Sequence, residues 1–186
     1  MKISRSHLLI DACCIINFWA SGHLLEILKV IPAQVAVTQV VLEEELQILQ
    51  RQQNEGDESA IQFQIAIDRD IVKIVDFDFD SDAETETFVN YLANNLGDGE
   101  AATFAIAFHR GWAIATDDKK AISFIQQEAP HLQIFSTPEI IKYWSEERKI
   151  DFPQLSEALN AVEKKGRYSP PKSHPLRNWW ENNLGR

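Results

Sequence analysis

Short apolar runs alternate with longer amphipathic segments along most of the chain. Each short run has the length and the polar boundaries of a buried β-strand, whereas the longer segments repeat apolar residues every three to four positions, as helices do. The expected strands are residues 6–12, 35–38, 70–77, 112–116 and 132–136. The expected helices are residues 14–28, 39–52, 59–67, 85–96, 99–111, 118–129, 137–149 and 152–165.

This alternation predicts an α/β fold with a mostly parallel sheet of about five strands. We expect residues 1–150 to form the main domain, and residues 151–186 to add a helix and a tail. The tail at residues 167–180 is rich in proline, so we expect it to be irregular. The acidic segment at residues 76–82 lacks the glycine of an EF-hand calcium loop, and we interpret it as a strand end leading into a helix.

Composition narrows the class of protein. The chain has 186 residues, 45% of them hydrophobic, which suits a globular domain with a proper core. Its apolar runs are shorter than the ~20 residues that cross a bilayer, and Asp11 interrupts the apolar N-terminus, so we expect no secretory signal. Cys13 and Cys14 are neighbours and cannot build an ordinary disulfide framework, so we expect reduced thiols in a cytoplasmic protein.

Charge is distributed unevenly along the chain. The formal net charge is −10, so the protein as a whole has no bulk attraction to nucleic acid. Residues 164–186 nevertheless carry +5, and Tyr168, Trp179 and Trp180 lie among their basic side chains. This arm either stacks on RNA and neutralises it, or packs onto the acidic body or a second copy, and we favour packing.

Acidic side chains lie where the predicted strands end and where helices begin. Asp11 ends the first strand, and Asp117 and Asp118 follow the fourth. Further acids stand in the first turns of two helices: Glu43, Glu44, Glu45, Asp98 and Glu100. Because the carboxyl ends of parallel strands meet at one edge of a sheet, four separate segments bring carboxylates to the same edge.

Several carboxylates without histidine partners favour a hard divalent cation, Mg²⁺ or Mn²⁺. Zinc is disfavoured because the five histidines are scattered, and none has ligand spacing with another. A metal in such a pocket can bind phosphate oxygens and activate water for in-line attack. The sequence therefore predicts a metal-assisted phosphate chemistry.

Each carboxylate also has a structural alternative. The simplest interpretation of Asp98 is a helix N-cap, and Glu100 is also a favourable charge in a first helical turn. One of Asp117 and Asp118 can cap the helix that follows. Asp11 has the weakest structural explanation, because it comes after a wholly apolar strand.

Four segments resemble the motifs of the PIN domain, the nuclease superfamily that includes VapC-type toxins. They follow the family's order and are LLIDACCIINF, VTQVVLEEEL, LGDGEAATFAIA and AIATDDKKA. The family's acids map onto Asp11, onto Glu44 six residues after Thr38, onto Glu100, and onto Asp118 two residues after Thr116. The resemblance leaves Asp117 as a substitute or additional ligand.

The resemblance implies a PIN-like α/β/α sandwich with the activity of a Mg²⁺- or Mn²⁺-dependent endoribonuclease. Asp11, Glu100 and Asp118 would hold the metal, and Glu44 would complete the pocket. It also implies an RNA substrate, homodimers and an inhibitory antitoxin protein as partners.

Other functions are also open. Many PIN domains have Ser or Thr at the position of Cys13, a weak hydrogen bonder. An inactive PIN-like scaffold that binds RNA or a protein is therefore the main alternative. A haloacid-dehalogenase-type phosphatase needs a second Asp at that same position, and a dinucleotide fold needs a glycine-rich turn before Gly22, so both are disfavoured.

Overall fold

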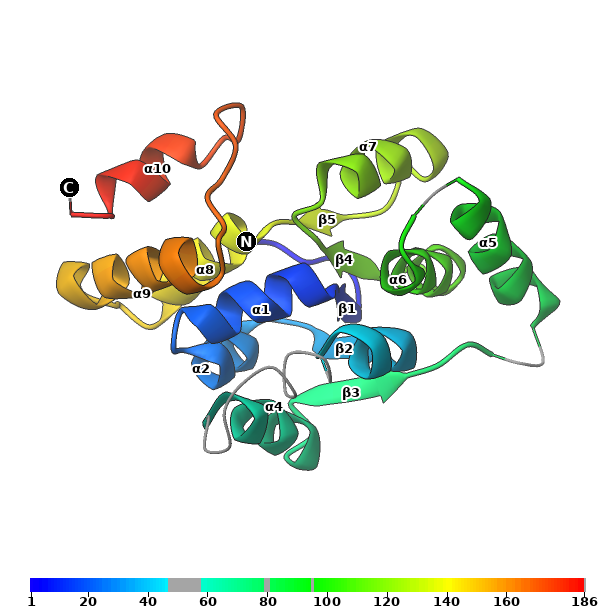
Figure 1. The fold of residues 1–186 in the computed structure, drawn as a ribbon, viewed down its shortest axis with the longest axis horizontal. Coiled ribbons are helices and arrows are strands. Elements are labelled where there is room, and N and C mark those ends of the chain that lie inside the picture. The colour runs from blue at the N-terminus through cyan, green and yellow to red at the C-terminus, as the bar shows by residue number, and fades with distance from the viewer. Residues whose placement is uncertain (47–57, 79–80, 95, 186) are drawn as a thin grey trace.

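The computed structural model describes residues 1–46, 58–78, 81–94 and 96–185, and for residues 44–46 and 58–61 it describes the backbone only. Five strands form one sheet in the order β3-β2-β1-β4-β5, and every pairing between them is parallel (Figure 1). The strands are β1 His7–Ile10, β2 Gln34–Thr38, β3 Val72–Val75, β4 Ala113–Ala115 and β5 Ile134–Phe135. The predicted α/β fold with a five-stranded parallel sheet is confirmed.

Helices connect and cover these strands. They are α1 Ala12–Ala20, α2 Leu24–Val30, η1 Val41–Leu46, α4 Glu58–Asp68, α5 Asp82–Ala93, α6 Asp98–Arg110, α7 Lys119–Glu128, α8 Thr137–Glu147, α9 Phe152–Lys165 and α10 Arg177–Asn182. Within the described ranges, no helix is long and apolar enough to cross a membrane.

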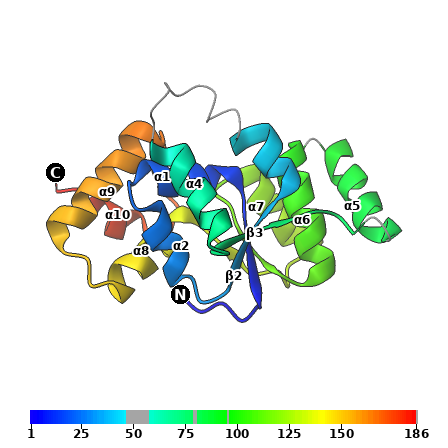
Figure 2. The same cartoon turned by 90° about the horizontal axis from the view of Figure 1, so that it is seen from below.

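Two hydrophobic cores lie on opposite faces of the sheet. Leu8 and Ile10 of β1 belong to the core that includes α1, α2, α8, α9 and α10. Leu9, which points to the other face, belongs to the core that includes α6 and α7. Figure 2 shows the strands between these two groups of helices, so the chain is an α/β/α sandwich.

Two expected helices differ in the structure. The helix predicted over residues 14–28 is divided into α1 and α2 by a turn at Gly22, whose φ of +81° is easily adopted only by glycine. The helix predicted over residues 39–52 includes the π-helix η1, while residues 47–52 lie outside the described residues.

The expectation of an irregular tail was wrong in part, because residues Arg177–Asn182 form α10. Apolar burial explains the helix: Trp180 is fully buried and Leu184 is nearly so, and both belong to the core around α1 and α9. The prolines of the tail precede α10, so they do not interrupt it. The packing interpretation of the arm is thus confirmed for Trp180.

Candidate active site

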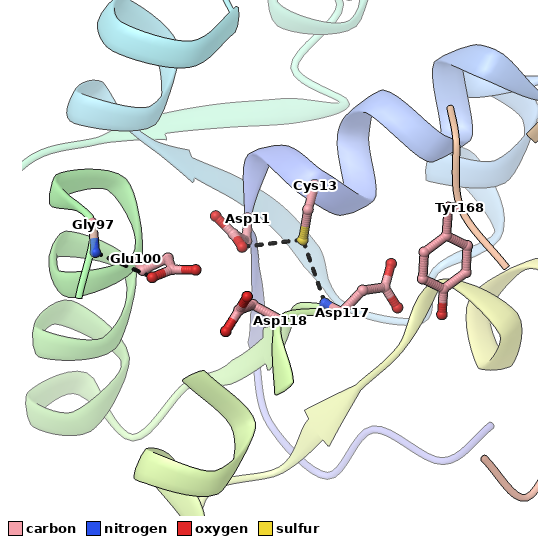
Figure 3. A pocket seen from close by; sticks show the side chains of 7 residues that line it. All are labelled: Asp11, Cys13, Gly97, Glu100, Asp117, Asp118 and Tyr168. Atoms are coloured by element: carbon pink, nitrogen blue, oxygen red, sulfur yellow. Dashed lines mark hydrogen bonds between the residues drawn. The ribbon is translucent and has the colours of Figure 1, made fainter. Parts of the chain in front are cut away.

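A pocket of about 440 Å³ lies at the edge of the sheet where β1 and β4 end. These two strands are paired neighbours, and Asp11 N donates a hydrogen bond to Ala115 O at 3.0 Å, so their carboxyl ends meet as the sequence predicted. The side chains that line the pocket come from separate parts of the chain (Figure 3). The lining residues are Asp11, Cys13, Gly97, Glu100, Asp117, Asp118 and Tyr168.

Asp11 stands at the junction of β1 and α1 and is only 3% exposed. Its Oδ1 accepts a hydrogen bond from Ala12 N (2.9 Å), and its Oδ2 accepts from Cys13 Sγ (3.1 Å) and Thr116 Oγ1 (3.0 Å). Burial raises the pKa of this carboxyl and the charge of Asp117 adds to the rise, although the three hydrogen bonds oppose it. A cation next to Asp11 would therefore stabilise its charged form.

Glu100 approaches the pocket from the first turn of α6. Gly97 N donates to Glu100 Oε2 at 3.1 Å, and Figure 3 shows the other carboxylate oxygen pointing into the pocket. Burial raises the pKa of Glu100, and the charges of Asp11 and Asp118 raise it further. The expectation that Asp98 is the N-cap was wrong: Gly97 holds that position, and Asp98 is the exposed first residue of the helix.

Asp118 follows β4 and is the N-cap of α7, since its Oδ1 accepts a hydrogen bond from Ala121 N at 2.8 Å. Its backbone N–H donates to Thr116 Oγ1 at 3.3 Å, and the same hydroxyl donates to Asp11. Thr116 thus joins the two strand ends. The side chain of Asp118 lines the pocket, and its charge raises the pKa of Glu100.

Asp117 also lines the pocket, but its carboxylate accepts hydrogen bonds from residues of two helices. Its Oδ1 accepts from Thr137 N at 2.9 Å, and its Oδ2 accepts from Asn17 Nδ2 at 3.0 Å and from Cys14 Sγ at 3.5 Å. Asn17 belongs to α1 and Thr137 begins α8. Asp117 therefore connects the end of β4 to both helices.

A family model described as a PIN domain (DUF3368) matches residues 7–175. The chain belongs to the PIN-domain family. Among solved structures, the fold is similar to a chain in the crystal structure of VapBC2 from Rickettsia felis bound to a DNA fragment from their promoter. The TM-score is 0.50 at 16% sequence identity, and the match covers 70% of this chain and 98% of that chain. No curated protein matches the chain in sequence.

The pocket contains three of the four acids that correspond to the PIN motifs: Asp11, Glu100 and Asp118. The fourth, Glu44, lies in η1, and its side chain is outside the described residues. This element packs against α1 and α6, the helices that begin beside Asp11 and Glu100. The fold of the PIN domain thus brings all four backbone segments together.

Two free thiols lie beside the carboxylates of this PIN domain. One potential ligand atom each from Cys13, Cys14 and Asp117 lies within 4.8 Å of the others. Burial raises the pKa of the Cys14 thiol well above its usual range, so this sulfur stays protonated. Because metals bind the thiolate, we interpret the thiols as hydrogen-bond partners of the carboxylates.

Sequence reasoning did not place three residues in this region: Asn17, Thr116 and Tyr168. Asn17 stands within an apolar helix and is only 3% exposed, and a polar residue in such a place signals a buried partner. In the sequence, Thr116 is only the last residue of a predicted strand, and Tyr168 is one aromatic residue of the basic arm. Nothing local indicates that either reaches the carboxylates.

Proposed function

We propose that this PIN domain is a Mg²⁺- or Mn²⁺-dependent endoribonuclease. The observation that carries the proposal is that Asp11, Glu100 and Asp118 come from three separate elements and line one pocket. Burial and neighbouring carboxylates raise the pKa of Asp11 and Glu100, so both would gain from a bound cation. Membership of a nuclease family supports the same activity.

The donor set fits a hard metal ion, because it consists of carboxylate oxygens. Asp11, Glu100 and Asp118 would hold the ion, with Glu44 as a further ligand or as the residue that positions the attacking water. A bound divalent metal supplies positive charge for the phosphate and lowers the pKa of water. Asp117 is better suited to hold the walls of the pocket together, since its oxygens accept hydrogen bonds from Asn17 in α1 and from Thr137 at the start of α8.

Hydrogen bonds from the protein hold each carboxylate in place before substrate arrives. Cys13 and Thr116 orient Asp11, Gly97 N orients Glu100, and Ala121 N orients Asp118. Fixed orientation lowers the cost of arranging charges around a phosphodiester during the reaction. The three carboxylates would thereby be held ready to bind a divalent metal ion in a single geometry.

A cleavage assay with Mn²⁺ and single-stranded or structured RNA tests the activity. Asp11→Asn and Glu100→Gln should each lower the cleavage rate more than about 100-fold, since losing even a residue that orients a metal ligand costs about 10–100-fold. Glu139→Gln is a matched control, because Glu139 accepts a hydrogen bond from the N-cap backbone N–H of α8 as Glu100 does in α6, yet lies outside the pocket. Cleavage that continues unchanged in both pocket variants would contradict the proposal.

An inactive scaffold is the second candidate, and the observation that favours it is Cys13. This thiol donates to Asp11 Oδ2 where many PIN domains have a hydroxyl. The two candidates differ in metal binding, because a scaffold has no need of it. A wild-type protein that cleaves no RNA and gains no thermal stability from Mn²⁺ would favour the scaffold, whereas a metal-bound state is stabilised by mass action.

We further propose that the protein is the toxin of a toxin–antitoxin pair, a cytoplasmic homodimer held inactive by an antitoxin protein. The similarity of its fold to the VapBC2 chain supports this role. A gene for a small protein next to the one for this chain, whose product copurifies with it and suppresses cleavage, is the expected result. If the protein is a monomer and no gene for a small protein lies next to its own, the toxin–antitoxin proposal is contradicted. The nuclease proposal is unaffected by that result.

A further inference from the structure

Tyr168 reaches the carboxylate pocket from the C-terminal segment, which we define as residues 166–185. We propose that its ring stacks on a nucleobase of single-stranded RNA next to the scissile phosphate, while Lys165 and Arg167 bind neighbouring phosphates. This inference rests on the proposed nuclease function and names how the same pocket takes its substrate. It concerns binding, so it can be tested apart from catalysis.

The position of Tyr168 is the first argument. Figure 3 shows its ring on the side of the pocket opposite Glu100, with the hydroxyl toward Asp117. A pocket of about 440 Å³ is within the range of ~300–1,000 Å³ typical of small-ligand sites, so it has room for a nucleotide unit. In this arrangement the carboxylates line one wall and an aromatic ring lines another.

The ring is also held in place, which lowers the entropy lost when a base stacks on it. The buried indole of Trp180 meets it edge to face, at a centroid distance of 6.0 Å and an interplanar angle of 82°. Tyr168 N donates to Val162 O at 3.4 Å, which ties the segment to α9. Tyr168 therefore presents a pre-positioned aromatic surface rather than a loose side chain.

The hydroxyl of Tyr168 adds no negative charge to the pocket. Burial and the charge of Asp117 raise the pKa of Tyr168 far above its usual range, so the phenol stays protonated at any physiological pH. A protonated phenol does not repel a phosphodiester, and it is unsuited to act as a base. These properties suit a binding residue.

Basic side chains flank Tyr168 along the chain. Lys164, Lys165 and Arg167 are exposed at the end of α9. They put positive charge next to Tyr168 in the chain, and positive charge is what a phosphodiester backbone needs in a protein of net charge −10. Arg177 differs, because it is bonded to Glu181 and to the backbone of the segment and so serves the fold.

Single-stranded RNA is the occupant that these features select. A base can stack on an aromatic side chain only when it is free of its duplex neighbours, and base–aromatic stacking tolerates any sequence. Trp179 and Trp180 do not offer a comparable surface, since Trp180 is fully buried and Trp179, although half-buried like Tyr168, does not line the pocket. The aromatic contribution to RNA binding therefore comes from Tyr168 alone among the three.

Binding of a fluorescent eight-nucleotide RNA to the full-length Asp11→Asn protein tests the stacking role without cleavage. Tyr168→Phe should change the dissociation constant less than about threefold, because the ring remains. Tyr168→Leu should weaken binding roughly 10-fold or more, the effect of losing one stacked base. Equal affinity of the Phe and Leu variants, both folded by circular dichroism, would overturn the inference.

A second measurement avoids any change at Tyr168. RNA carrying 5-iodouridine, irradiated with the Asp11→Asn protein, should crosslink to the peptide that contains Tyr168. Crosslinks only to other peptides would overturn the inference. Wild-type protein that fails to cleave RNA while Asp11→Asn still crosslinks at Tyr168 would instead count against the nuclease proposal alone.

Matched charge variants test the phosphate contacts. Lys165→Gln/Arg167→Asn removes two charges beside Tyr168, and Arg148→Gln/Lys149→Asn removes two exposed charges before α9. Arg167 and Lys149 both have positive φ values, 53° and 52°, which asparagine tolerates. The first pair should weaken RNA binding. It should also make the plot of log binding constant against log salt concentration less steep, by about 0.7 per lost phosphate contact. If both pairs weaken binding equally, net charge alone explains the effect. That result would overturn the proposal that Lys165 and Arg167 contact phosphates.

Discussion

At the scale of single residues, the buried carboxylate of Asp11 should make the stability of the protein depend on pH. Its pKa is raised by burial, so the folded protein holds this proton more tightly than the unfolded chain does. Over the pH range between the two pKa values, stability therefore falls as pH rises. Above that range, the folded protein without metal carries the full cost of a buried charge.

Asp11→Asn removes that charge and should stabilise the metal-free protein at pH 7. We expect a rise in Tm of roughly 2–4 °C, the shift that about 1 kcal/mol produces in a chain of this size. The gain should shrink as the pH falls toward the ordinary carboxyl pKa of 3.8, because wild-type Asp11 then becomes protonated in the folded state. Thermal unfolding in EDTA from pH 4 to 8 measures it, with the exposed Asp98→Asn as control. A lower Tm at pH 7 would mean that the hydrogen bonds to Asp11 outweigh its burial.

Cys13 sets the orientation of Asp11 together with Thr116. Cys13→Ser keeps a hydrogen-bond donor and should leave the cleavage rate within about threefold of wild type. Cys13→Ala removes the donor, and we expect a loss of roughly 10-fold, at the lower end of effects for residues that orient metal ligands. Initial rates across Mn²⁺ concentrations measure both variants. Full activity of Cys13→Ala would show that the hydrogen bond from Thr116 is sufficient to orient Asp11.

At the scale of elements, two close approaches shape the pocket. Helix α6 lies against the sheet through small side chains, since Ala101, Ala102 and Ala105 are fully buried, and this brings Glu100 to the strand ends. At the end of α9, Gly166 fits against α1: a Cβ there would lie 2.7 Å from Asn17 Oδ1 and 2.8 Å from Val162 O. The segment that carries Tyr168 begins at this point.

Gly166→Ala should therefore destabilise the protein by about 1–3 kcal/mol, the usual cost of overpacking. The added methyl group pushes on Asn17, which donates to Asp117, so the pocket should be disturbed as well. Gly97→Ala is the control, because its Cβ meets only Glu100 Oε2 at an ordinary 3.7 Å. Urea unfolding measures both, and an unchanged midpoint for Gly166→Ala would show that α9 can move away at no cost.

At the scale of the whole molecule, the C-terminal part of the chain belongs to the core around β1. Leu155 and Leu159 of α9 and Trp180 of α10 join Leu8 and Ile10 in one hydrophobic cluster. Trp180 Nε1 also donates to Glu163 Oε1 at 3.2 Å. Figure 1 shows α9 and α10 on the side of the molecule away from α5. We expect residues 151–185 to unfold together with the sheet.

Trp180→Ala should lower the free energy of unfolding by about 3–5 kcal/mol, the cost of truncating a buried aromatic residue. Trp179 is only partly buried, so Trp179→Ala should cost less than about 2 kcal/mol. Urea unfolding followed by circular dichroism compares the two. A small loss for Trp180→Ala, or a separate early transition, would indicate that the C-terminal part folds on its own.

The order of strands and helices could be predicted from the sequence because hydrophobic periodicity is a local property. The break at Gly22 was missed, since a glycine within an apolar pattern can lie inside a helix or end it. The helix α10 was missed, since a tryptophan pair after prolines does not by itself indicate a helix. The meeting of the acids after β1 and β4 also followed from the sequence, because parallel strands bring their carboxyl ends to one edge. The resemblance to PIN domains singled out Glu100 and Asp118.

Only the tertiary structure could distinguish Asp117 from Asp118, and only it could place Tyr168 beside them. Both acids follow the same strand, but the partners of Asp117 are Asn17 and Thr137, which lie 100 residues before it and 20 after it. Which groups the carboxylate of Asp117 contacts depends on how α1 and α8 pack, and no local pattern contains that information. The sequence by itself determined that acids gather at the ends of β1 and β4, because hydrophobic periodicity is local, and long-range packing decided what each of them contacts.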